Sequence, residues 1–437
     1  MAANSASPIS PSDLDAIIKL MWGNEVKEDV FQRWKQGFRF STDEPTALIQ
    51  HEGGPCAVIA PVQAYIIKSL ISDKKRKSPN WNEVESECVG KLLIRALCEI
   101  LGQAYDGNRF VLVQMSDSIL DEETTKTPPS PDAKKPKDHS YFHSQLRTLS
   151  FESPEEVEAY YLERIDMLGE TFGVLLFLYS VLCTKGIEAL HTEAIDPSET
   201  FIDSEFGYGS QSLINLMITG KAVAHVWNYD QDICGLKLKG IQQQSQIGFL
   251  TLLEHLRYCE VGSFLKNPMN PVWVLGSETH LTVLFSFESR LVCAETPTEV
   301  AKRVFKSFDP EGRNFISADL LQDVLNMLDL VSEPEYVDIM RKKLDAENLG
   351  IILLSSFMEE FFPEENVHLP DTFTLYHYNG LLRSCPNNKV VYQKGNAILL
   401  ETHVLSVLEN NGMLTCLQTK WPNIEVQWVG GSTPSLN

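Results

Sequence analysis

The chain has 437 residues, of which 43% are hydrophobic, and its formal net charge is −22 at pH 7. This length and apolar content suffice for a substantial buried core and leave room for two domains. The acidic charge argues against general nucleic-acid binding, because contact with phosphates needs a positive surface. It suits basic patches on a protein partner, although an acidic excess more often serves solubility alone.

Cysteine usage indicates a reduced, intracellular setting. An odd number of cysteines without a CxxC pair argues against disulfides and against a zinc site, so we expect free thiols, no bound metal, and a location in the nucleus or the cytoplasm. The first residues carry no basic region followed by an apolar stretch, so we expect no secretory signal. The nine cysteines are Cys56, Cys88, Cys98, Cys183, Cys234, Cys259, Cys293, Cys385 and Cys416.

The first half of the chain reads mostly as helices. Ser10 is placed to cap a helix that begins with proline, and amphipathic segments follow to about residue 70 and again over 83–101. Residues 116–145 are rich in proline and charge, which predicts a disordered insertion loop. Helical patterns resume over 154–185. The apolar run 173–183 is too short to cross a bilayer and is expected to be a buried helix, so no membrane association is predicted.

The short basic run Lys74–Lys77 is the exception to the acidic composition. Such a run is typical of a nuclear localisation signal, but it is also typical of a solvated loop.

A single cysteine, Cys56, follows two glycines at the predicted start of an apolar helix that runs to about Leu70. The unpaired amide groups and the positive dipole end of that helix favour a thiolate over a thiol. Gly53 and Gly54 would let the backbone adopt conformations closed to other residues and approach a substrate. Gln50 could donate its side-chain amide to a developing oxyanion. The alternative is that Cys56 is a small buried hydrophobic residue.

A histidine suited to such a cysteine occurs more than two hundred residues later. From His280 onward the sequence alternates as a β-strand does, which places His280 and Thr282 on one face. A thiol protease needs an imidazole that takes the cysteine proton and passes it to the leaving amine. A cysteine at a helix start and a histidine on a later strand follow the papain-like order. The alternative is a structural histidine. His139 and His143 fall in the predicted polar linker.

Several blocks of sequence closely resemble the MINDY deubiquitinases, cysteine proteases that trim lysine-48-linked ubiquitin chains, and within them the member with an EF-hand-like region. The matching blocks span nearly the whole chain: residues 31–38, 52–64, 173–181, 208–216, 276–282 and 419–422. The resemblance implies that Cys56 is the nucleophile, that His280 is the general base and acid, and that Gln50 is the oxyanion donor. Thr282 occupies the place of a polar residue that would orient the histidine.

The resemblance also implies the partners, which are lysine-48-linked polyubiquitin and ubiquitinated proteins, and a reaction that needs no cofactor. An alternative of another class is a catalytically inactive, ubiquitin-binding scaffold that carries an EF-hand-like interaction module. A calcium sensor is a third alternative.

Residues 296–363 read as two helix–loop–helix units with the outline of calcium-binding loops. Several positions lack the oxygen ligand, the turn glycine or the bidentate glutamate that calcium needs: Arg313, Asn314 and Leu320 in the first loop, and Leu349 and Ser356 in the second. We therefore expect a structural EF-hand-like pair that binds little or no calcium.

The remaining residues alternate as strands do over 372–378, 389–392 and 424–428, with Asn-Gly turn signals at Asn379 and Asn411. The sequence therefore predicts an α+β fold, a papain-like cysteine protease with a helical EF-hand-like insertion. Its expected divisions are a catalytic domain over 1–295, the EF-hand-like pair over 296–363, and a β-rich segment over 364–437 that completes the catalytic domain.

Overall fold

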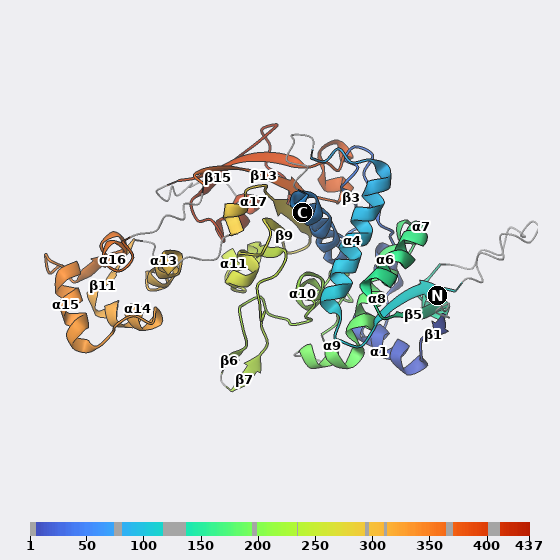
Figure 1. Ribbon diagram of the computed structural model, residues 1–437, viewed down its shortest axis with the longest axis horizontal. Coiled ribbons are helices and arrows are strands. Elements are labelled where there is room, and N and C mark those ends of the chain that lie inside the picture. Colours follow the sequence, from blue (N-terminus) through green and yellow to red (C-terminus); the bar gives the residue numbers. More distant parts are fainter. Residues whose placement is uncertain are drawn as a thin grey trace, which may run out of the picture. The chain divides into compact units, whose positions relative to one another are not determined.

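The structure is a computed structural model that describes residues 6–73, 81–116, 137–194, 199–233, 235–292, 297–309, 313–363, 370–400 and 411–437. It divides into two compact units, of which the first joins Met1–Ser289 to Thr372–Asn437 and the second is Arg290–Asp371 (Figure 1). Each unit combines helices and strands, so the α+β class predicted from the sequence is confirmed.

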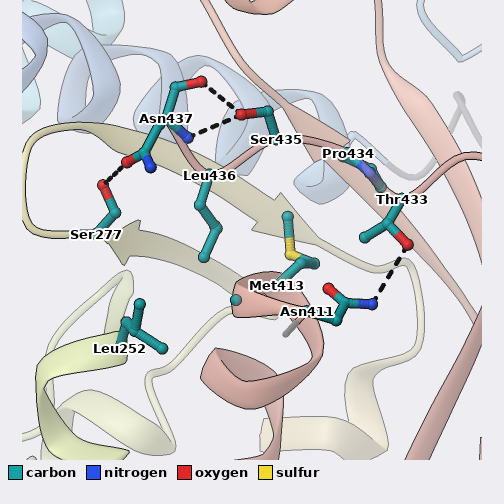
Figure 2. A pocket seen from close by; sticks show the side chains of 10 residues that line it. Leu252, Ser277, Asn411, Met413, Thr433, Pro434, Ser435, Leu436 and Asn437 are labelled. Carbon is teal, nitrogen blue, oxygen red and sulfur yellow. Dashed lines mark hydrogen bonds between the residues drawn. The ribbon is translucent and has the colours of Figure 1, made fainter. Parts of the chain in front are cut away.

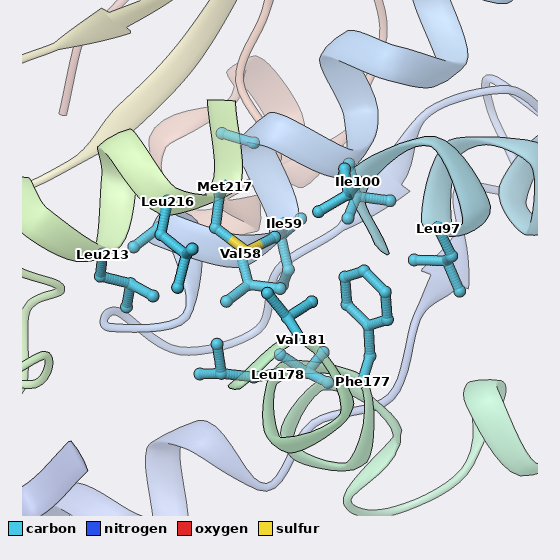
Figure 3. Packing of buried hydrophobic residues seen from close by; sticks show 14 of the residues in the cluster. Val58, Ile59, Leu97, Ile100, Phe177, Leu178, Val181, Leu213, Leu216 and Met217 are labelled. Carbon is cyan, nitrogen blue, oxygen red and sulfur yellow. The ribbon is translucent and has the colours of Figure 1, made fainter. Parts of the chain in front are cut away.

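Helix α3 lies in the core of the first unit, where α4, α8 and α10 contact it. Figure 3 shows side chains of α3, α4, α8 and α10 interlocking in one apolar cluster, with Val58 and Ile59 of α3 at its centre. Every residue of α3 from Cys56 to Ile67 is buried, as expected for a helix without a polar face. The helices of this unit are α1 (Pro11–Trp22), α2 (Glu28–Trp34), α3 (Cys56–Ser72), α4 (Ser86–Ala104), α5 (His139–Gln145), α6 (Pro154–Glu163), α7 (Ile165–Gly169), α8 (Gly173–Lys185), α9 (Ile187–Glu193), α10 (Gln211–Thr219), α11 (Leu252–His255), α12 (Ser263–Lys266) and α17 (Gly412–Gln418).

A six-stranded sheet packs against α3. Its strands are, in spatial order, β15 (Ile424–Trp428), β14 (Gln393–Leu399), β13 (Thr372–Tyr378), β10 (Leu281–Phe285), β9 (Val272–Gly276) and β8 (Gly248–Thr251). Neighbours are antiparallel, except that β8 and β9 are parallel. Strands β9 and β10 contact α3 and are buried along their whole length, which explains their nearly continuous apolar sequence. Strand β10 also pairs with β13, although the second unit lies between them in the sequence.

Three smaller sheets complete the first unit. A three-stranded sheet has the order β1 (Ser7–Pro8), β5 (Leu146–Phe151), β4 (Phe110–Met115), and two-stranded sheets join β2 (Arg39–Phe40) to β3 (Leu48–Ile49) and β6 (Gln231–Ile233) to β7 (Leu236–Leu238). In the described part of the chain no single helix is long and apolar enough to span a membrane; α8 and α9 reach that threshold only as a pair that bends by 83°.

The second unit has its own core and two helix–loop–helix segments. They comprise α13 (Pro297–Ser307), β11 (Phe315–Ser317), α14 (Leu321–Met327), α15 (Pro334–Leu344), β12 (Ile351–Leu353) and α16 (Leu354–Phe361). Strands β11 and β12 pair antiparallel through Ile316 and Ile352, which are both buried. Among the residues described, no group of three or more His, Cys, Asp or Glu side chains is placed to hold a metal ion.

Four local predictions are wrong, and one of them is the strand expected over 389–392, since these residues precede β14 and are not part of a strand. Residues 139–145 were expected in a disordered loop but form α5, because Phe142 and His143 are buried and Tyr179 hydrogen-bonds the His143 ring at 2.7 Å. Asn379 does not make a tight hairpin, since β14 begins only at Gln393, and Asn411 caps α17 instead of making a turn. The basic run Lys74–Lys77 and most of the expected loop, residues 117–136, lie outside the described residues.

Candidate active site

Cys56 is the first residue of α3, as the sequence predicts. The carbonyl of Pro55 accepts hydrogen bonds from the amides of Val58 and Ile59, which starts the helix directly at the cysteine. The Cys56 side chain is buried, and its thiol donates to the carbonyl oxygen of Gly54 at 3.6 Å. The sulfur therefore rests against its own loop.

Only one of the two loop glycines has a conformation that requires glycine. Gly54 has φ +124°, and a Cβ there would lie 2.8 Å from Trp34 Nε1 and 2.9 Å from the Gly207 carbonyl oxygen. Trp34 Nε1 donates to that same carbonyl at 2.9 Å, so neither atom can move freely. Gly53 has no positive φ, and a Cβ there would meet only the end of the Arg383 side chain, at 3.5 Å. The expectation that both glycines adopt special conformations is thus wrong for Gly53.

Burial has the largest effect on the acidity of Cys56. It raises the pKa of the thiol to about 11, whereas backbone contacts with Leu281, Gly54 and Ala57 lower that pKa by less. The expectation of a thiolate at rest is therefore wrong for this state, because the charged sulfur would lose more hydration than the backbone returns.

His280 lies directly before β10, one residue outside the strand on which the sequence placed it. The turn that carries it is closed by Ser277, whose hydroxyl accepts from the His280 amide at 3.0 Å. The His280 ring is buried, and its Nε2 lies 3.0 Å from Oδ1 of Asn379. Burial lowers the pKa of His280 to about 4; the bond to Asn379 opposes this shift, and the Arg383 cation adds to it.

Asn379 determines which nitrogen of the ring carries the proton. Its Oδ1 also accepts from the Leu381 amide, at 2.9 Å, so the oxygen rather than the NH₂ group must face this side. His280 Nε2 is therefore the donor, and Nδ1 is the nitrogen with a free lone pair. An imidazole in this tautomer can accept a proton from a thiol through Nδ1.

Gln50 lies beside residues 380–382, which directly follow Asn379. Its amide donates to Gly380 O at 2.8 Å and its carbonyl accepts from Leu382 at 3.3 Å, so the chain at Gln50 runs parallel to the chain at Leu381. Its side-chain Nε2 donates to the Glu52 carbonyl at 2.8 Å. The residues after β13 thus hold both the His280 ring and the Gln50 backbone. The side-chain amide of Gln50 is thus bonded to the loop of residues 51–55 that leads to Cys56, which we call the cysteine loop.

Thr282 does not hold the histidine in this structure. It lies on β10 and is fully buried, and its hydroxyl has no hydrogen-bond partner among the residues described. The residue that contacts the ring is Asn379, ninety-nine positions after His280. Sequence reasoning missed it because an Asn-Gly pair after a strand is a strong hairpin signal. The available signal was chemical, since a Cys–His pair commonly has an asparagine or aspartate as its third member.

Comparison with known proteins identifies the family of this chain. The family model for the deubiquitinating enzyme MINDY-3/4 conserved domain matches residues 19–304. The chain belongs to the MINDY-3/4 deubiquitinase family. That match contains Gln50, Cys56 and His280, whereas Asn379 lies beyond it. The family predicted from the sequence is therefore confirmed.

Relatives of the MINDY-3 type align along nearly the whole chain. A Drosophila melanogaster protein named ubiquitin carboxyl-terminal hydrolase MINDY-3 homolog is 50% identical, over 97% of this chain and 83% of its own. The human ubiquitin carboxyl-terminal hydrolase MINDY-3 is 46% identical, over 96% of this chain and 98% of its own. A mouse protein named probable ubiquitin carboxyl-terminal hydrolase MINDY-4 is 30% identical over 60% of this chain and 35% of its own. No solved structure matches the chain significantly.

Proposed function

We propose that this protein is a thiol-dependent deubiquitinase that hydrolyses the isopeptide bond after the C-terminal glycine of ubiquitin. The observations that carry the proposal are the position of Cys56 at the start of α3, with its thiol beside the backbone of Leu281 next to His280, and the contact of His280 with Asn379 after β13. Together Cys56, His280 and Asn379 supply a nucleophile, a base in a defined tautomer and the group that orients it, as in papain-like proteases. The names of the relatives support ubiquitin as the substrate.

The reaction begins when His280 Nδ1 takes the thiol proton of Cys56 and the sulfur attacks the glycine carbonyl carbon. The oxyanion that forms is held by the Gln50 side-chain amide and by amides at the start of α3. His280 returns the proton to the lysine amine, which leaves, and a thioester to Cys56 remains. Water, deprotonated by His280, then releases ubiquitin and restores the thiol. No step needs a cofactor.

Substrate must change the site before this reaction can proceed. With a thiol pKa of about 11 and an imidazole pKa of about 4, the proton stays on sulfur at neutral pH. The Gln50 amide is bonded to Glu52 and the thiol to Gly54, so the cysteine loop holds both groups away from their roles. We propose that binding of the ubiquitin tail displaces this loop and frees the sulfur and the amide together.

Selectivity for lysine-48-linked chains is part of the proposal and rests on the family resemblance. The test uses the full chain and two substrates, long lysine-48-linked and long lysine-63-linked ubiquitin chains, with Cys56→Ala beside the unmodified protein. We expect only the lysine-48-linked chains to shorten, and no cleavage by Cys56→Ala.

Cleavage of both chain types would remove the linkage part of the proposal and leave the enzyme. Undiminished cleavage by Cys56→Ala would reject Cys56 as the nucleophile. If the unmodified protein is folded and binds the chains but cleaves neither, the inactive scaffold becomes the better description. The engaged Gln50 amide and the neutral thiol are the observations that favour this second candidate.

A further inference from the structure

The segment Thr433–Asn437 lies next to the His280 turn, far from it in sequence. Leu436 is buried and points into a groove beside Leu252 and Met413, as Figure 2 shows. At the other end of the segment Asn411 Nδ2 donates to Thr433 Oγ1 at 3.3 Å. These contacts fix the segment on the surface of the first unit.

Thr433–Asn437 also provides the hydrogen-bond acceptors for the side-chain NH₂ group of Asn379. Asn379 Nδ2 donates to the carbonyl oxygens of Ser435, at 3.1 Å, and Asn437, at 3.4 Å. If this amide were rotated by 180°, its oxygen would face two carbonyls and its NH₂ group would face the Leu381 amide. Acceptors would then oppose acceptors and a donor would oppose a donor. The two carbonyls therefore hold Oδ1 toward His280.

A second contact reaches the backbone of the histidine turn. The Asn437 side-chain oxygen accepts from the hydroxyls of Ser277, as drawn in Figure 2, and of Thr279, at 3.3 Å. The Ser277 hydroxyl in turn accepts from the His280 amide. The segment thus contacts Asn379, which holds the His280 ring, and Ser277, which holds the His280 backbone.

We propose that Ser435, Leu436 and Asn437 are positioning residues for His280, which they act on through the Asn379 amide and the Ser277 turn. This inference rests on the proposed role of His280 as the base. If the segment is displaced, the Asn379 side-chain amide becomes free to rotate. A rotated amide presents its NH₂ group to the His280 ring and selects the tautomer with the proton on Nδ1. That tautomer cannot take the thiol proton.

The test is a double-mutant cycle in the full chain between Leu436→Asp, which places a charge in the apolar groove, and Asn379→Ala. Turnover is measured with ubiquitin carrying a fluorogenic amide at its C-terminus. We expect Leu436→Asp to lower kcat about 10- to 100-fold with little change in KM, since misplacing a catalytic group by about 1 Å costs on that order. In the Asn379→Ala background the same substitution should cost clearly less, because only the contact with the Ser277 turn is then left to lose.

Val429→Asp is the matched control, since it makes the same chemical change at an exposed side chain of the same C-terminal stretch. It should leave kcat unchanged. Asn437→Ala, which removes the contacts to Ser277 and Thr279 without charging the groove, keeps the inference testable if Leu436→Asp lowers the melting temperature. Nitrogen-15 spectra of the histidine rings, with His280→Gln to assign the signal, should show one tautomer in the unmodified protein and a mixture in Leu436→Asp.

Equal losses from Leu436→Asp in the two backgrounds, or an unchanged His280 tautomer, would overturn this inference and leave the proposed function standing. Full activity of Cys56→Ala would instead reject the proposed function, and this inference with it.

Discussion

Among single residues, the location of one proton decides the reactivity of the site. Burial places that proton on Cys56, by raising the pKa of the thiol and lowering that of the His280 imidazole. Both shifts arise from the same cause, which is the loss of hydration of a charged form. A substrate that fills the site with polar peptide groups, and that moves the cysteine loop, replaces some of this hydration. Reactivity is therefore expected to depend on bound ubiquitin.

The oxyanion role of Gln50 can be tested with an isosteric change. We expect Gln50→Glu to lower kcat by about 10²- to 10³-fold, because it replaces an amide donor by a carboxylate that repels the oxyanion. KM for the fluorogenic ubiquitin substrate and the circular dichroism spectrum should stay close to those of the unmodified protein. A kcat within a factor of two of the unmodified value would exclude this role.

His377 is buried like His143 and His280, and it has no catalytic assignment. It lies on β13 opposite Leu284, and neither ring nitrogen has a hydrogen-bond partner in the described part of the chain. Replacing an unsatisfied buried polar ring by leucine removes a desolvation cost of about 1–3 kcal/mol. We expect His377→Leu to raise the midpoint of urea unfolding at pH 7.5. His255→Leu, at an exposed side chain, is the control, and an equal effect of the two would contradict the explanation.

At the scale of elements, one short segment organises the site. Residues 379–382 follow β13 directly, and they contact both the His280 ring and the Gln50 backbone. The cysteine loop meets a different support, since Gly54 packs against Trp34 and the Gly207 carbonyl. The loop can therefore move relative to the base only by changing its own backbone conformation.

Gly53 and Gly54 provide a matched pair of sites for testing whether the backbone conformation of the cysteine loop positions Cys56. Gly54→Ala forces a side chain against Trp34 Nε1 at a positive φ, and strain of this kind costs about 1–3 kcal/mol. We expect it to lower the unfolding midpoint and to reduce kcat, because the strained loop shifts Cys56. Gly53→Ala meets only a flexible arginine end and should resemble the unmodified protein in both measurements. Equal effects of the two substitutions would show that the conformation at Gly54 is not the determining factor.

Local chemistry was sufficient to predict some elements but not others. The start of α3 at Cys56 follows from glycines, a proline and an apolar run, and β13 follows from the alternation of residues 372–378. The contact of Asn379 with His280 depends on β13 pairing with β10 across an intervening unit. No local pattern encodes that pairing. The same holds for α5, whose polar composition conceals two buried aromatic rings, Phe142 and His143.

At the scale of the whole molecule, three histidines that are buried in the described part of the chain link stability to pH. Burial lowers the pKa of His143 to about 4, of His280 to about 4 and of His377 to about 3, and a neighbouring histidine adds to the shift at His143 and at His377. In the unfolded chain these rings bind protons below about pH 6.5, whereas in the folded protein they stay neutral until about pH 4. The unfolded state therefore binds more protons, and stability falls as pH decreases through this window.

Urea unfolding at pH 7.5, 6.5 and 5.5 measures this effect. The unfolding free energy should decrease already between the first two values, because each ring is half protonated in the unfolded chain at pH 6.5, and more steeply between the second and the third. His377→Leu should make the decrease smaller, because one of the three rings no longer takes up a proton on unfolding. A pH dependence that is unchanged in this variant would mean that other groups cause it.

The pairing of β10 with β13 also sets the order in which the site is made during synthesis. A ribosome completes Gln50, Cys56 and His280 before it has translated the second unit, and it reaches Asn379 and Thr433–Asn437 only afterwards. A nascent chain can thus carry the nucleophile and the histidine while nothing yet orients the ring. If the proposed function is correct, activity appears only after translation has passed the inserted unit, and we expect nascent chains or truncated products that stop within this unit not to cleave ubiquitin conjugates.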